Sequence, residues 1–268
     1  MPDRKRETDE ERAQRYEALE AEAPVLNLSE YHKHSRRALL TGGVAALVAA
    51  GSYRWFLNRP DDRRANSVLR KGHEFNEALW RRLTRDGAMA PTFDPSESSE
   101  LRVNGRHGIR EEVDLGSWEM TVEGPDGTVL GTHVLGDITA FPKVEMTVEH
   151  KCVEGWSHVV TWGGTRFSDF AQPYLEQFGE LPRFVSLETP NGDYYVGMDI
   201  ESMLHPQTML TYELQGEPLS SLHGAPLRLT TPNKYGIKQL KRIGRIQFTD
   251  EQPDDYWADR GYDWYAQL

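Results

Sequence analysis

The sequence predicts a β-rich α+β domain preceded by a helical N-terminal region. Its 268 residues, 38% of them hydrophobic and 27% charged, suit one large globular domain with extensions. Beyond residue 101 short strand-like runs alternate with Gly, Pro and Asp, one helix is predicted at 167–178, and no repeats interrupt the pattern. The predicted strands cover 118–123, 143–149, 183–188, 208–214, 226–231 and 244–249.

The N-terminal region divides into a charged tail and an apolar segment. Residues 1–34 are rich in Arg, Glu and Asp, and we expect a solvated tail or a fraying helix. Residues 35–57 begin with the pair Arg36 and Arg37 and continue without charge from 38 to Arg54. As a helix, the 20 residues 38–57 would be about 30 Å long, just enough to span a hydrocarbon core. We therefore predict a membrane-directed helix.

The paired arginines are typical of a bacterial twin-arginine signal, which exports folded proteins. An ordinary signal-anchor shares the pattern, and cleavage after Ala50 or retention as an anchor are both open. Either alternative predicts a membrane-anchored or periplasmic protein whose catalytic domain is extracytoplasmic. Residues 58–100 are predicted to form a connector with one helix near 67–85, and residues 101–268 form the main domain.

Charge and cysteine content exclude several function classes. Residues 1–60 hold ten Lys/Arg and nine Asp/Glu, so the net charge of −11 arises after residue 60, where 21 Lys/Arg stand against 33 Asp/Glu. Such an acidic body would repel phosphate backbones, and we expect no nucleic acid partner. Cys152 is the one cysteine, which excludes intrachain disulfides and multi-cysteine metal sites. It is either a buried apolar side chain or a single soft ligand or nucleophile.

Two local motifs contain the candidate chemistry. Cys152 ends a predicted strand, and Lys151, His150 and His158 lie near enough in sequence to favour a thiolate. The second motif places five cations within fifteen residues, which indicates either an anion site or a solvated charged face. No P-loop pattern is present. The five cations are Arg228, Lys234, Lys238, Lys241 and Arg242.

Together these motifs resemble a known family. Lys-Cys-Val-Glu-Gly-Trp-Ser at 151–157, followed by Gly-Ala-Pro-Leu-Arg-Leu and Lys-Tyr-Gly-Ile-Lys within 224–238, resembles the oxidoreductase molybdopterin-binding domain of the sulfite oxidase superfamily. Within it, the chain is most similar to the catalytic subunits of bacterial periplasmic methionine-sulfoxide reductases. The resemblance covers roughly 100–250 and implies the sulfite-oxidase-type fold and an oxygen-atom-transfer enzyme.

The resemblance also implies a cofactor and its ligands. A molybdenum-molybdopterin cofactor with one pyranopterin dithiolene would be bound, and Cys152 falls on the position of the catalytic, metal-ligating cysteine. A thiolate is the ligand type that a soft-ligated metal prefers. By position, the resemblance implies cofactor contacts from Asn104, His107, Gly108, Cys152, Thr189, His223, Arg228, Gln239, Leu240 and Lys241.

One departure bears on the substrate. Sulfite oxidases place an arginine soon after the molybdenum cysteine, whereas here Glu154, Gly155 and Trp156 follow. Reduction of a neutral S-oxide is therefore expected, with Trp156 and Trp162 as an apolar wall. Arg166 would weaken this argument if it entered the site. The alternatives are a sulfite dehydrogenase or a non-catalytic tethered binding module. Expected partners are a small-molecule substrate, a membrane haem or quinol-linked electron donor, and the twin-arginine export machinery.

Overall fold

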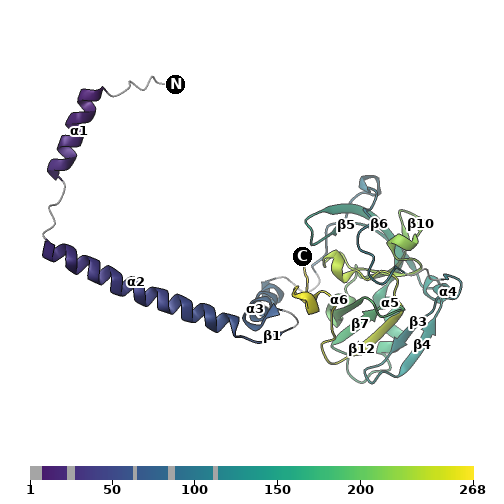
Figure 1. Ribbon diagram of the computed structural model, residues 1–268. Helices are drawn as coiled ribbons and strands as arrows, with labels where there is room; N and C mark the ends of the chain where they lie inside the picture. The colour runs from purple at the N-terminus through teal and green to yellow at the C-terminus, as the bar shows by residue number, and fades with distance from the viewer. Residues whose placement is uncertain (1–7, 23–27, 63–64, 84–87, 111–113) are drawn as a thin grey trace. The chain divides into compact units, whose positions relative to one another are not determined.

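The computed structural model describes residues 8–22, 28–62, 65–83, 88–110 and 114–268. The chain forms two compact units, Met1–Arg59 and Pro60–Leu268, each of which is described by itself (Figure 1). The first unit contains helices α1 (Asp9–Glu22) and α2 (Leu28–Leu57). Within the described residues no helix combines the length and the apolar character needed to cross a membrane. The membrane-directed role of residues 35–57 stays a prediction.

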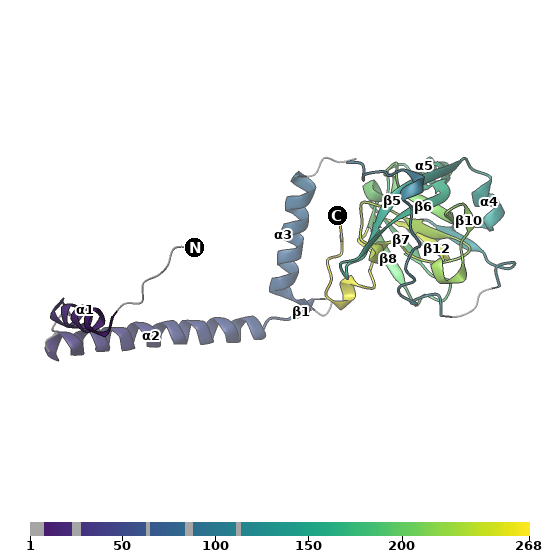
Figure 2. The same ribbon diagram turned by 90° about the horizontal axis from the view of Figure 1, so that it is seen from above.

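The second unit begins with a small hairpin and a helix. Strands β1 (Asp61–Asp62) and β2 (Ala65–Asn66) lead into α3 (Ser67–Leu83), close to the helix predicted in the connector. Arg70 of α3 is buried and donates to the carbonyl oxygens of Ala258, at 2.8 Å, and Tyr262, at 2.9 Å. Figure 2 shows α3 beside the C-terminal segment. The predicted connector thus packs within the same unit as the main domain.

One five-stranded sheet positions the turn that contains Cys152. It is antiparallel in the order β10, β9, β6, β5, and β11 also pairs with β9. The β5–β6 hairpin brings His150 opposite His158 and closes through a turn in which the Cys152 amide donates to the Trp156 carbonyl at 2.9 Å. Its strands are β5 (Lys143–Lys151), β6 (Ser157–Arg166), β9 (Met209–Leu214), β10 (Glu217–Pro218) and β11 (Arg228–Thr230).

The second five-stranded sheet has the order β4, β3, β12, β7, β8. Only the β3–β12 pair is parallel among its described pairings. Short helices α4 (Leu135–Thr139), α5 (Phe167–Leu175) and α6 (Ile200–Met203) connect its strands with the first sheet. Its strands are β3 (Met120–Glu123), β4 (Val129–His133), β7 (Phe184–Glu188), β8 (Tyr195–Asp199) and β12 (Arg245–Thr249). The six predicted strands are present, so the β-rich α+β expectation is confirmed, whereas β4, β6, β8 and β10 were not predicted.

A single large core holds the sheets together. Phe167 and Phe170 of α5 pack with Leu210 of β9 and with Leu187 and Phe248 of the second sheet. A smaller cluster on the first sheet contains Val148, Val160 and Trp162. Burial of such side chains contributes about 1.5–3 kcal/mol each to folding, which stabilises the strands from which the loops extend. Those loops carry the candidate site.

Candidate functional site

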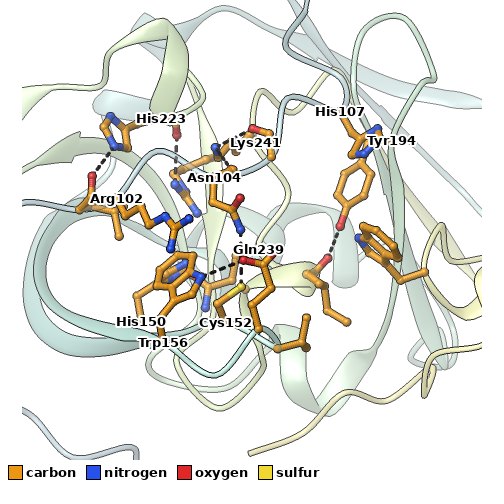
Figure 3. Close-up of a pocket in the computed structure, with 18 of the residues that line it drawn as sticks. Arg102, Asn104, His107, His150, Cys152, Trp156, Tyr194, His223, Gln239 and Lys241 are labelled. Atoms are coloured by element: carbon orange, nitrogen blue, oxygen red, sulfur yellow. Dashed lines mark hydrogen bonds between the residues drawn. The ribbon is translucent and has the colours of Figure 1, made fainter.

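A cavity of about 270 Å³ contains most of the residues that the sequence singled out (Figure 3). Its walls come from four stretches far apart in sequence: 101–107, 150–156, 223–241 and 257–262, with Tyr194 completing one side. Seven of the ten predicted cofactor residues line it: Asn104, His107, Cys152, His223, Arg228, Gln239 and Lys241. The fold therefore assembles both motifs at one place.

Cys152 lies in the turn that follows β5 and is half-buried. The side-chain amide of Asn104 donates to its sulfur at 3.7 Å, and both side chains point toward one another in Figure 3. A sulfur that faces a cavity and accepts a hydrogen bond can act as a ligand, because its lone pairs are exposed to an incoming group. The alternative of an inert buried cysteine therefore does not fit the geometry.

The cations expected to favour a thiolate do not do so. Burial, with Arg228 nearby, lowers the pKa of His150 to about 3, so this ring is neutral at physiological pH. Lys151 pairs with Glu149 at 3.2 Å instead of facing the sulfur. The expectation for these two neighbours was wrong, because the strand alternation turns one into the protein and the other onto the surface.

His150 instead serves a structural role at the cavity floor. Its Nδ1 lies 3.1 Å from the Gln239 side-chain oxygen, whose amide nitrogen donates to the Thr231 carbonyl at 3.1 Å. Gly236 passes so close that a Cβ there would lie 3.0 Å from His150 Nε2. This contact fixes Gln239 and the last loop against the cysteine hairpin.

Two of the cations that line the cavity, Arg228 and Lys241, come from the second motif. Arg228 is 2% exposed, packs 4.5 Å from the Trp162 ring centroid and donates to the His223 carbonyl at 3.1 Å. Lys241 donates to the Asn104 carbonyl at 2.7 Å and to the Leu222 carbonyl at 3.0 Å. Burial lowers the pKa of Arg228 to about 9 and that of Lys241 to about 7. Neither forms an ion pair with a carboxylate of the described residues.

The other three cations of the cluster are used elsewhere. Lys234 lies 3.5 Å from Asp199 and Lys238 lies 2.7 Å from Asp255, all four side chains being buried. Arg242 is also buried and donates to the Ala225 carbonyl at 3.0 Å. Both interpretations of the cluster, a single anion site and a solvated face, were therefore wrong for these three. The sequence spacing could not reveal that carboxylates from β8 and the C-terminal segment would reach Lys234 and Lys238.

Three predicted cofactor residues lie outside the cavity lining. Gly108 has a φ of +72° and packs against Thr189, whose methyl would lie 2.2 Å from an added Cβ. The Thr189 hydroxyl donates to Asn191 at 2.9 Å. Leu240 is fully buried in the core, and its carbonyl accepts from the Leu229 amide at 2.9 Å. Their contacts with a cofactor stay predictions.

The structure adds residues that sequence reasoning did not assign to the site. Arg102 lies 5.5 Å from the Trp156 ring centroid, and Glu154 accepts from the Trp156 indole at 3.0 Å. Tyr194, Trp257 and Tyr262 also line the cavity, but Trp162 is fully buried behind Arg228 and not part of the lining. The residues after 250, to which no role was given, thus form one wall. No local motif marks them, because tertiary packing alone brings them there.

The comparison with known families decides the family. Residues 107–257 match the model of the oxidoreductase molybdopterin-binding domain. The chain belongs to this family. Membership makes it a molybdopterin-dependent oxidoreductase and confirms the enzyme, cofactor and family expectations over a non-catalytic module.

Known relatives extend the comparison. YedZ1 of Azospira oryzae, provisionally named as a protein-methionine-sulfoxide reductase subunit, is 30% identical over 236 residues, 86% of this chain and 85% of that protein. MsrP of Campylobacter jejuni, named as a protein-methionine-sulfoxide reductase catalytic subunit, is 33% identical over 60% of this chain and 59% of its own. The sulfane dehydrogenase SoxCD of Paracoccus pantotrophus is similar at 18% identity with a TM-score of 0.47, over 67% of this chain and 53% of that one.

The residues present fit the family's cofactor. A soft sulfur ligand, Cys152, faces the cavity, as a sulfur-ligated metal requires. Arg228 supplies a buried guanidinium whose Nε has no hydrogen-bond partner in the described structure, and Lys241 is directed to the same side. An anion such as a pterin phosphate would satisfy both cations, and buried charges need such a partner.

Proposed function

We propose that this protein reduces a neutral S-oxide, such as a methionine sulfoxide, by oxygen-atom transfer. The observation that supports this most is the chemistry beside Cys152. Glu154 and Trp156 line the cavity there, where sulfite oxidases place an arginine. The Glu154 carboxylate accepts a hydrogen bond from the Trp156 indole. A sulfite dianion would need fixed cations to replace its hydration, whereas a neutral sulfoxide needs only a polarising donor and an apolar wall.

Two of the three described Lys and Arg residues that line the cavity support the same assignment. Arg228 and Lys241 are the cations suited to the cofactor phosphate, so neither is free for an anionic substrate. Arg166, which could have supplied a replacement, is exposed at the end of β6 and is not part of the cavity lining. The relatives named as methionine-sulfoxide reductases favour the same direction of chemistry.

Different residues of the cavity would ligate the metal, bind the phosphate and contact the substrate. Cys152 would ligate the metal, and the Asn104 amide, which donates to its sulfur, would orient the thiolate. Arg228 and Lys241 would hold the phosphate, with Gln239 fixed by His150 beside the pterin. When bound, the molybdenum cofactor supplies two-electron redox chemistry. Trp156 would pack against the substrate and limit access of water.

We further infer an extracytoplasmic location, with export through the twin-arginine machinery and electrons from a membrane haem or quinol-linked partner. Arg36 and Arg37 precede the apolar stretch of α2, whose Leu39, Leu40 and Leu47 are more than two-thirds exposed. Such a helix favours an apolar environment, because exposed leucines cost free energy in water.

A sulfite dehydrogenase is the second candidate. Arg102, which the sequence analysis did not consider, lines the cavity and lies near the Trp156 face, so it could pair with an anionic substrate. Substitution of Arg102 therefore tests whether sulfite is oxidised at this site.

A substrate panel tests the proposal. Molybdenum-loaded protein would be assayed with a reduced dye and sulfoxides or N-oxides in one arm, and with sulfite and an electron acceptor in the other. We expect turnover of sulfoxides to exceed sulfite oxidation. Sulfite turnover with a micromolar KM and no sulfoxide activity would establish the dehydrogenase instead, and loss of that turnover in Arg102→Met would identify its anion site.

A further inference from the structure

A second cavity, of about 370 Å³, adjoins the cofactor cavity. Val153, Ile237 and Tyr262 line both cavities, so the two adjoin each other directly beside Cys152, which precedes Val153 in the chain. Its remaining lining comes from α3, from Tyr235 and from the C-terminal segment 260–267. None of these residues is among those assigned to the cofactor.

Most of this second cavity lies outside the part of the chain that matches the family. The family match covers 107–257, whereas His73 of α3 and every lining residue from Arg260 to Gln267 fall beyond it. The cofactor cations and Cys152 lie inside the match. A cavity built mainly by segments outside the family domain, next to its reaction centre, is placed to select substrates, since it can vary without disturbing the chemistry.

The lining indicates what the cavity accepts. Tyr235, Ile237, Val153 and Tyr262 offer aromatic and aliphatic surface, of which Val153 is 37% and Tyr262 41% exposed. The two charged groups are already used by the protein: Arg260 donates to the Tyr256 carbonyl at 2.7 Å, and Asp263 accepts from the Ala266 amide at 2.9 Å. The unused surface therefore suits an apolar or aromatic side chain.

The spacing fits a peptide. In an extended chain, side chains two residues apart point to the same face and lie roughly 6.5–7 Å apart. Because Val153, next to Cys152, lines both cavities, a side chain at this spacing from one bound beside Cys152 can enter the second cavity. We propose that the second cavity binds an apolar or aromatic side chain two residues from the oxidised methionine of a peptide substrate. This inference rests on the proposed function and deepens it: beyond the sulfoxide itself, the enzyme selects an apolar or aromatic residue at one flanking position.

Matched peptides test the proposal on the cofactor-loaded enzyme. Two pairs of methionine-sulfoxide peptides would differ only by Phe or Gly, two residues before the sulfoxide in one pair and two residues after it in the other. We expect kcat/KM to be about ten- to a hundred-fold higher for Phe at one of these positions. Equal values in both pairs would overturn the proposal.

A variant that fills the second cavity tests whether the preference for Phe over Gly arises there. His73→Trp would place a large ring in the cavity from α3, and we expect the Phe-to-Gly ratio to fall toward one. Glu74→Trp is the matched control, because Glu74 is exposed, adjoins His73 and does not line this cavity. Gln267→Trp fills it from the other side and covers the case in which His73→Trp fails to fold. A ratio unchanged in both filling variants would overturn the assignment.

A binding measurement separates this inference from the proposed function. Isothermal titration would compare the unoxidised methionine peptides, Phe against Gly, on the loaded enzyme. Tighter binding of the Phe peptide that is lost in His73→Trp supports the subsite even if no S-oxide is reduced, in which case the proposed function alone fails. S-oxide turnover without any discrimination in binding or kinetics rejects the subsite and leaves the proposed function standing.

Discussion

At the scale of single residues, the sulfur of Cys152 is the group whose loss should matter most. We expect Cys152→Ser to abolish turnover and to change the absorption spectrum of the metal centre, because a hydroxyl is a poorer ligand than a thiolate for a soft-ligated metal. Ser157→Ala is the control, since Ser157 is exposed and bonds to Glu149 outside the cavity. Full activity of Cys152→Ser would remove the ligand assignment.

The half-buried Lys241 at the cavity gives a pH dependence. Burial lowers the pKa of Lys241 in the folded protein to about 7, from its usual value near 10.5. Between these values the unfolded chain binds the extra proton, so the stability of cofactor-free protein should rise with pH above about 7. Lys234, whose pKa burial also lowers to about 7, adds to the same trend.

A bound phosphate should remove the contribution of Lys241, because an adjacent anion keeps the ammonium charged in the folded state. We therefore expect Tm to rise less between pH 7 and 9.5 for the loaded protein than for the cofactor-free protein. Lys241→Met should abolish this difference, whereas Lys234→Met should retain it. Parallel Tm profiles for the loaded and free wild-type protein would contradict the assignment.

The residues that sequence could and could not identify differ in how they reach the cavity. Cys152 and Lys241 stand in recognisable local motifs, and their positions in the chain suffice to assign them. Trp257 and Tyr262 reach the cavity because the C-terminal segment folds back over it, which no local pattern encodes. Likewise, the pairing of Lys238 with Asp255 depends on tertiary contact and not on spacing.

At the scale of elements, the loop that carries Asn104 and His107 depends on two glycines. Gly105 and Gly108 both have positive φ, +69° and +72°, but only Gly108 lies against Thr189. We expect Gly105→Ala to lower the free energy of unfolding by about 1 kcal/mol through backbone strain. Gly108→Ala should cost about 1–3 kcal/mol more, because the added methyl overlaps the Thr189 side chain. Chemical denaturation measures both, and equal losses would contradict the close packing.

The C-terminal wall is anchored by a buried ion pair. Asp255 accepts from Lys238 at 2.7 Å and also from the backbone amides of Trp257 and Ala258. Asp255→Ala should lower the free energy of unfolding by about 3–5 kcal/mol, since the buried Lys238 ammonium loses its carboxylate and keeps only the Gly197 carbonyl as an acceptor among the described residues. Glu145→Ala, which breaks the exposed pair with Lys143, should cost less than about 1 kcal/mol. Comparable losses in denaturant would indicate that Lys238 is satisfied in another way.

The elements that sequence missed have physical reasons. β6 contains Gly163 and Gly164, which weaken a strand prediction, yet Gly164 is required there because a Cβ would lie 2.3 Å from the Leu210 carbonyl oxygen. β4 contains Gly131 next to the Tyr174 hydroxyl in a similar way. The strands that were predicted have β-branched or aromatic residues without such interruptions, for example β7 and β12.

At the scale of the whole molecule, the arginine pair should decide where the protein is found. We expect Arg36→Lys combined with Arg37→Lys to leave the protein on the cytoplasmic side, because the twin-arginine route reads the arginines themselves. Fractionation with immunodetection measures this, and Lys33→Arg, nearby on the same helix, is the control. Unchanged export of the double variant would indicate an ordinary signal-anchor.

The four stretches that surround the cavity also have a consequence for timing during synthesis. Because residues from 101 to 262 contribute to one cavity, a ribosome must release residue 262 before the walls can close. The cysteine hairpin can form early, but its loop remains without Gln239, Lys241 and Trp257 until those residues have emerged. The complete cofactor site is then available only after residue 262 has emerged, and an export route that accepts folded cargo would act after that point.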